Sequence, residues 1–158
     1  MITVESVWKR ELIRLADKLQ NRYKQKRWTI LSRAALEKQV FIGAFALRKL
    51  LDSKKISKKL SEKKIGTMFY PLRNPNEIKE PIKHFTHAFD LLHGTRHELT
   101  MRELMDQFIH SHHFSPFVPF GQSMVGIYVA SDWKRKKGLY YVMLKRLAEV
   151  LREVGSEV

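Results

Sequence analysis

Histidine is the residue type in this sequence best suited to chemistry. All seven histidines lie between His84 and His113. Imidazole is the commonest metal ligand and a frequent acid or base near neutral pH. No His-Glu-x-x-His or other familiar metal spacing is present, so we expect neither a bound metal nor a cofactor. The weak candidate ligands are His84, His87, His112 and His113.

His110 is the histidine for which the sequence suggests catalysis. Residues 105–110 read Met-Asp-Gln-Phe-Ile-His, which resembles the end of the motif of HEPN-type ribonucleases, where an arginine lies five residues before the histidine. That position is Met105 here, and the closest arginine is Arg102. The resemblance implies acid–base cleavage of RNA with His110 as the acting group. The alternative is that His110 is buried and hydrogen-bonded in a structural role.

Positive charge is concentrated in the first part of the chain. The formal net charge is +14, and residues 1–64 hold 18 of the 30 Lys/Arg but only 6 of the 16 Asp/Glu. A strong positive charge favours polyanionic partners and does not determine the fold. We therefore expect one domain over 1–158, with a basic helical part (1–64) and a nearly neutral part rich in histidine and aromatic residues (65–158).

Three cationic groups are candidates for contacting phosphate. The first is a line of cations at i+4 spacing on the first helix, and Tyr23 and Trp28 interleave with the cations at the end of that helix. The second group consists of paired lysines. The third is the tip of a predicted hairpin. The predicted nucleic-acid-binding residues are Arg10, Arg14, Lys18, Arg22, Lys26 and Arg27; Lys54, Lys55, Lys58 and Lys59; and Trp133, Lys134, Arg135, Lys136 and Lys137. Each group can equally be a solvated surface.

Periodicity predicts the elements that position these groups. Apolar residues at helical spacing predict helices near 7–26, 32–52, 82–93 and 101–112. The period then changes to two, which predicts three antiparallel strands within 114–143, the first at an edge because it contains prolines. A short strand over 65–70 and a closing helix that Gly155 ends are also indicated.

The second helix is the predicted centre of the fold. Its stretch Val40–Leu47 is apolar on every side, so we expect neighbours to cover all of it. Ser32 is its expected N-cap. Gly43 costs about 1 kcal/mol relative to alanine in a helix, and we expect it to admit another backbone closely.

The sequence therefore predicts an α+β protein, with a layer of four helices packed on a small three-stranded antiparallel sheet and a C-terminal helix. The predicted function is non-enzymatic binding of DNA or RNA, or of a nucleoprotein, with the three cationic groups brought side by side by the fold. The alternatives are a ribonuclease-like enzyme using His110 and a module that binds an acidic protein. No stretch is long enough to span a membrane and the N-terminus lacks the order of a signal peptide, so a cytoplasmic protein is expected.

Overall fold

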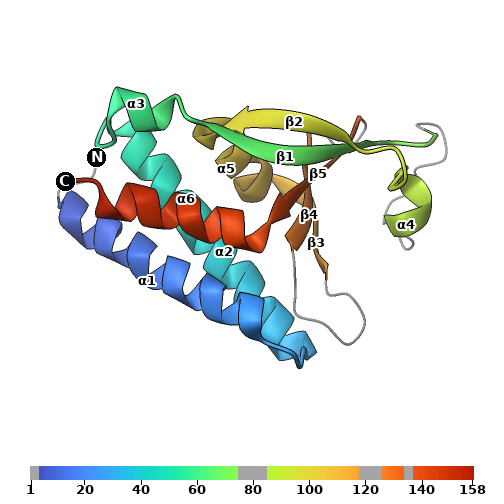
Figure 1. The fold of residues 1–158 in the computed structure, drawn as a ribbon, viewed down its shortest axis with the longest axis horizontal. Coiled ribbons are helices and arrows are strands. Elements are labelled where there is room, and N and C mark those ends of the chain that lie inside the picture. The colour runs from blue at the N-terminus through green and yellow to red at the C-terminus, as the bar shows by residue number, and fades with distance from the viewer. Residues whose placement is uncertain (1–3, 75–84, 118–125, 134–136) are drawn as a thin grey trace.

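The computed structural model describes residues 4–74, 85–117, 126–133 and 137–158. Five strands in this part of the chain form one antiparallel sheet in the order β2-β1-β5-β4-β3. Figure 1 shows α1, α2, α5 and α6 on one side of the strands and α4 on the other. The elements are α1 (Glu5–Lys24), α2 (Ile30–Asp52), α3 (Lys58–Ser61), β1 (Lys64–Pro71), α4 (Phe85–Ala88), β2 (Thr95–Thr100), α5 (Met101–Ile109), β3 (Ser111–Phe117), β4 (Gly126–Ser131), β5 (Gly138–Met143) and α6 (Leu144–Ser156).

The α+β class is confirmed, but the prediction of a three-stranded sheet is wrong. β3, β4 and β5 are the predicted strands, and β3 lies at an edge as expected. β1 and β2 extend the sheet at the side of β5. β2 gives no alternating apolar signal because, of its residues Thr95–Thr100, only Leu99 is buried. An edge strand that is exposed on both faces has no apolar period to detect.

The predicted four-helix layer is also wrong in two places. Residues 82–84 lie outside the described part, and α4 is a single turn that ends before Phe89. The Asp90 carboxylate there accepts a hydrogen bond from the Leu92 N–H (3.2 Å) and contacts His93 Nδ1 (2.7 Å), which favours a turn over a further helical turn. α5 ends at Ile109 rather than near 112, because the following residues pair with β4 as β3.

The two long terminal helices of the layer, α1 and α6, run side by side (Figure 1). The apolar face predicted on α1 is confirmed, since Leu12, Leu15 and Leu19 are fully buried. Gly155 does not end α6, which continues to Ser156. It lies at the tightest point of the contact, where a β-carbon would be 2.7 Å from the carbonyl oxygen of Lys9. This glycine therefore permits the close helix–helix approach that we expected at Gly43.

α2 packs on one side only, contrary to prediction. Thr29, not Ser32, is its N-cap, and Ser32 completes the capping box. A β-carbon at Gly43 would meet side-chain atoms of Leu151 at 3.1 Å and not a backbone. Ile42 and Phe45 remain 38% and 48% exposed. The helix is apolar all round, but its neighbours α1 and α5 do not enclose it.

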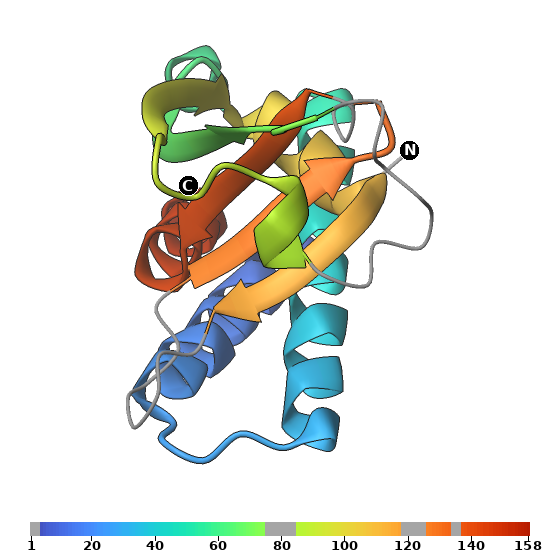
Figure 2. The ribbon, with the colours of Figure 1, turned by 90° about the vertical axis from the view of Figure 1, so that its right-hand side faces the viewer.

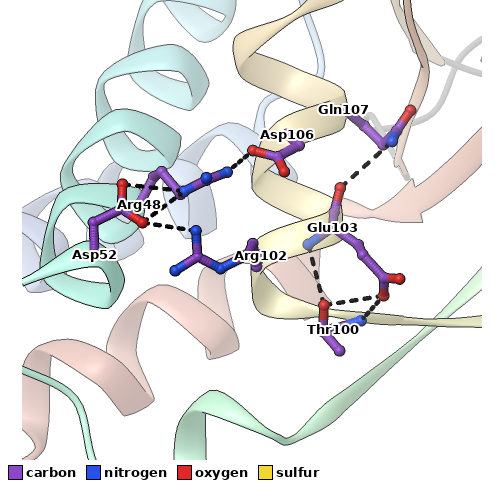
Figure 3. Close-up of polar contacts among 7 residues, drawn as sticks. All are labelled: Arg48, Asp52, Thr100, Arg102, Glu103, Asp106 and Gln107. Carbon is purple, nitrogen blue, oxygen red and sulfur yellow. Dashed lines mark hydrogen bonds and ion pairs between the residues drawn. The ribbon is translucent and has the colours of Figure 1, made fainter. Parts of the chain in front are cut away.

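Ion pairs join α2 to α5 (Figure 3). Arg48 pairs with both Asp52, at 3.1 Å, and Asp106. Arg102 at the start of α5 reaches the same Asp52 carboxylate at 2.7 Å. Burial raises the pKa of Asp52, but hydrogen bonds from Arg102 and Arg48 outweigh it and the pKa is lowered. Two arginines and two aspartates therefore alternate between α2 and α5, and the charges of this network cancel.

A buried amide fixes the other end of α5. Gln107 Oε1 accepts a hydrogen bond from the backbone N–H of Ser131 at 3.1 Å, where β4 ends. The N–H of Asp132 donates to the carbonyl oxygen of His110 at 2.9 Å. These two hydrogen bonds tie the end of α5 to the end of β4.

Candidate nucleic-acid interface

The fold separates the paired lysines from Lys137, the one cation of the predicted hairpin tip that the structure describes. The paired lysines precede β1 and lie near its first residue, Lys64. Lys137 lies at the other end of β1, because the Leu72 N–H donates to its carbonyl oxygen at 3.0 Å and Pro71 pairs with Gly138 at the start of β5. Seven residue steps of about 3.3 Å separate these two ends by roughly 23 Å.

Only the later part of the predicted line of cations on α1 is far from the paired lysines, because Arg10 is just five residues, or about 8 Å, from Glu5. The lysines approach the start of α1, where Lys55 pairs with Glu5 at 3.4 Å. Lys24, at the end of α1, is nineteen residues from Glu5, or about 28 Å at 1.5 Å per residue. The later cations of α1 and Lys137 therefore lie well away from the paired lysines, and a continuous surface from all three groups stays a prediction.

Carboxylates also neutralise some of the predicted contacts. Arg14 is bonded to Glu11 through its Nε at 2.7 Å, and the pairing holds the pKa of that carboxyl below its usual value although burial opposes it. Lys58 lies 3.8 Å from Glu62. These cations are less available to phosphate than the sequence suggests.

One cationic group, at the turn from α1 to α2, forms no ion pair in the described residues, although Lys18 lies within electrostatic range of Glu11 and Lys24 shares a groove with Glu149. Between Asp17 and Glu37 the sequence has six Lys/Arg and no acidic residue. Arg22 bonds amide oxygens, those of Gln25 (2.9 Å) and Gln39 (3.5 Å), which leave its charge uncompensated. In the described part of the chain, no carboxylate forms an ion pair with any of the six. We call this group the cationic corner: Lys18, Arg22, Lys24, Lys26, Arg27 and Arg33.

Trp28 in this turn is structural rather than available for stacking. Its indole Nε1–H donates to the carbonyl oxygen of Gln25 at 3.0 Å, and the ring packs against the core. It stiffens the link between α1 and α2, so that the backbone of the cationic corner is held in place.

The sheet presents a second face, opposite the helices, that the sequence did not reveal. Figure 2 looks onto this outer face, with α4 in front of the strands. Phe89, which follows α4, is fully buried against Ala130 and Leu139 and covers the end of the face near the hairpin tip. The other end is less covered, since Met143 at the end of β5 is 52% exposed.

Four rings contact one another on this outer face. Tyr128 lies at the centre, with ring centroids 5.0 Å from Tyr141, 5.8 Å from Tyr70 and 5.8 Å from Phe117. They come from β1, β3, β4 and β5, and the strand register places them on one side of the sheet. We call these four rings, Tyr70, Phe117, Tyr128 and Tyr141, the aromatic face.

The aromatic face is held in place by close packing against the backbone. A β-carbon at Gly126 would lie 2.5 Å from the Tyr141 ring, so the ring rests directly over this glycine. Burial raises the pKa of Tyr141 to about 12, and the hydroxyls of Tyr128, Tyr70 and Tyr23 add to the shift. Phe117 remains 40% exposed. The rings therefore form an ordered surface that still meets solvent.

One member of the cationic corner, Lys24, lies near the aromatic face, in a groove that also holds Glu149, whereas Lys18 and Arg22 line a different groove. Tyr23 near the end of α1 is within electrostatic range of Tyr141. Tyr23 and Lys24 also line a groove with Lys145, which is two residues beyond the end of β5 at Met143. A ligand at the open end of the sheet would therefore meet cations from α1 and α6 next to exposed rings.

The hairpin root forms a separate aromatic cluster. Trp133 is 68% exposed, and its ring lies 4.7 Å from the His110 ring at an angle of 41°. His110 is exposed and caps the end of α5, so the expectation that it is buried is wrong. Lys134, Arg135 and Lys136 lie outside the described residues, while Lys137 is exposed.

No family model, curated protein or solved structure matches this chain significantly.

The histidines do not assemble a recognisable reactive centre in the described residues. Arg102 begins the α5 helix that His110 caps, eight residues or about 12 Å away, and pairs instead with Asp52. His112 Nδ1 lies 3.5 Å from Asp132, and His87 is exposed in α4. His84 lies outside the described part. Within that part, no cluster of three or more His, Asp or Glu could hold a metal ion.

No helix in the described part of the chain has the length and apolar character needed to cross a bilayer.

His113 Nε2 is buried with no hydrogen-bond partner among the described residues, and burial, with His112 nearby, lowers the pKa of His113. This imidazole therefore favours its neutral form.

Proposed function

We propose that this protein binds nucleic acid without cleaving it, and that the cationic corner contacts phosphates while the aromatic face lies beside the bound strand. The observation that carries the proposal is a group of six cations that form no ion pair in the described residues, one of which, Lys24, lines a groove with Tyr23 near the partly exposed rings.

The two surfaces supply complementary interactions. Lysine and arginine side chains displace the counterions condensed on phosphates, and this release favours binding at low salt. Aromatic rings stack on bases of any sequence because every base has a flat π-face. A surface of this kind binds with little sequence preference, and no base-reading motif was found in the sequence.

A charge-matched pair of variants tests the role of the cationic corner. The corner variant replaces Lys24, Lys26 and Arg27 by Gln. The control variant replaces Lys54, Lys58 and Lys59 by Gln, and it lowers the net charge by the same three units at the other end of α1. Binding of a fluorescent single-stranded oligonucleotide is followed by anisotropy over a range of salt concentrations.

We expect the corner variant to bind at least about tenfold more weakly and the control to bind nearly as the unchanged protein does. Three lost phosphate contacts would also reduce the slope of log K against log salt by about 2, because each contact with a single strand contributes about 0.7. Equal losses in both variants would show attraction by net charge alone. No binding by the unchanged protein would overturn the proposal and favour an acidic protein as the partner.

A further inference from the structure

A shallow pocket lies on the outer face of the sheet, beside the aromatic face. Its volume is about 370 Å³, and it spans β2, β1 and β5. The register places Gly66 opposite Glu98 and Met68 between Arg96 and Tyr141. The outward-facing residues that line it are Gly66, Met68, Arg96, Glu98, Tyr141 and Met143.

Gly66 forms an open floor for the pocket. A β-carbon built at this position would meet no atom within 4 Å, and its backbone is not in the left-handed region that favours glycine. Glycine in a strand interior lowers stability, since it leaves nothing to pack on the sheet. Neither packing nor backbone conformation explains this residue, and the effect of its missing side chain is to create space on the surface.

The walls of the pocket combine the groups that recognise a flat, polar-edged ring. Tyr141 and the thioethers of Met68 and Met143 provide apolar and polarisable contact. Arg96 supplies N–H donors and Glu98 supplies carboxylate oxygens, both exposed at the rim. A nucleobase has this shape and carries both donors and acceptors on its edge.

The surroundings favour a base that belongs to a strand. Tyr141 is shared between the pocket and the aromatic face, so a chain leaving the pocket would pass over Tyr128 and Phe117. Met143 at the pocket wall leads into α6 and Lys145, which lines the groove with Tyr23 and Lys24. The backbone of a strand with a base in the pocket could therefore reach Lys145 and Lys24, the nearest member of the cationic corner.

We propose that the Gly66 pocket receives an unstacked base of a single-stranded nucleic acid, an inference that rests on the function proposed above. A duplex keeps its bases stacked and paired, and cannot place one there without opening. The pocket thus makes the protein selective for single strands over duplexes, which the cationic corner alone would not do.

The test fills the pocket without touching the rings or the cations. Gly66→Leu places a side chain in open space, and Gly66→Ala is the control that fills little of it. The probes are a fluorescent 12-nucleotide single strand, as RNA and as DNA, and the duplex of the same sequence. Urea denaturation of each variant shows that the sheet is intact, and we expect both to be at least as stable as the unchanged protein.

We expect Gly66→Leu to weaken single-strand binding about tenfold, since one stacked base contributes about that much or more. Duplex binding and the Gly66→Ala variant should be unaffected, and the RNA and DNA probes show whether the sugar matters. Equal single-strand binding by Gly66→Leu and the unchanged protein would refute the proposal that the pocket receives a base, and would not affect the proposed role of the cationic corner. Failure of the unchanged protein to bind either probe would overturn both proposals.

Discussion

Substitution of Gly155 by alanine should destabilise the protein, although alanine usually stabilises a helix. The new β-carbon would lie 2.7 Å from both the Lys9 carbonyl oxygen and Ile13 Cγ1, and 3.1 Å from the Ile13 nitrogen. Ordinary contacts of this kind are about 3.5–4.0 Å, so α1 and α6 must separate by roughly 1 Å. Two of the three obstacles are backbone atoms, which cannot rotate away.

The magnitude follows from two opposing effects. Alanine gains up to about 1 kcal/mol in helix propensity, less near the end of α6. Overpacking a close contact costs about 1–3 kcal/mol, so we expect a net loss of about 1–2 kcal/mol in the free energy of unfolding. In a chain of this length, such a loss lowers the midpoint of thermal unfolding by a few degrees.

Gly43→Ala is the matched control for this prediction, since Gly43 is also a buried helical glycine. Its new β-carbon would meet only side-chain ends, those of Leu151 at 3.1 Å and Leu15 at 3.7 Å, which can shift. We expect it to be close to neutral. Urea unfolding followed by circular dichroism measures both variants. A Gly155→Ala protein as stable as the Gly43→Ala protein would refute the packing described for α1 and α6.

Three further predictions concern single side chains. Replacing Arg48 by Met should lower the free energy of unfolding by about 1 kcal/mol at pH 7, since its ion pairs are partly exposed. A double-mutant cycle with Asp106→Asn measures the coupling between Arg48 and Asp106. The part of the loss that comes from the lowered pKa of Asp52 should disappear as the pH falls below about 4. His113→Phe should raise the free energy of unfolding most below pH 6.5, because a His113 pKa that is lowered in the folded state costs stability as the pH falls through the unfolded-state value. Unfolding of the variant and of the unchanged protein, measured from pH 5 to 8, checks this. Curves of unfolding free energy against pH that run parallel for the two proteins would contradict it. In a titration followed by ultraviolet absorbance, the tyrosine ionisation step at about pH 12 should be absent in Tyr141→Phe and present in Tyr23→Phe.

Much of the helical layer was predictable from the sequence because its helices have one solvent-exposed face and one buried face. α1 and α6 show this directly, since apolar residues at helical spacing are the ones that become buried. β4 and β5 were also found, because their buried residues are numerous and lie between turn residues. Periodicity reports burial, and it succeeds where burial decides the structure.

Periodicity failed where burial was absent or one-sided. β2 is held by pairing with β1 and gives no apolar signal of its own. Ile42 and Phe45 on α2 remain exposed, although an apolar segment predicts coverage. The turn after Phe89 depends on the Asp90 side chain, a local interaction that the apolar spacing of this segment conceals.

The candidate site was predictable only in part. The sequence singles out Lys18, Arg22, Lys26 and Arg27 together with Lys54, Lys55, Lys58 and Lys59. What distinguishes the two groups is where carboxylates lie in space. The aromatic face could not be found from one strand at a time. Its four rings come from four strands, and only the sheet register brings them to one side.

The most direct test of the proposed interface is a map of backbone amide shifts in an ¹⁵N-labelled sample titrated with an unlabelled 12-nucleotide single strand. We expect the changes to gather at Arg22–Arg27 and on β1, β4 and β5 around Gly66, Tyr128 and Tyr141, with α3 unaffected. Changes centred on the α3 lysines or on the hairpin around Trp133, with none on the aromatic face, would contradict it.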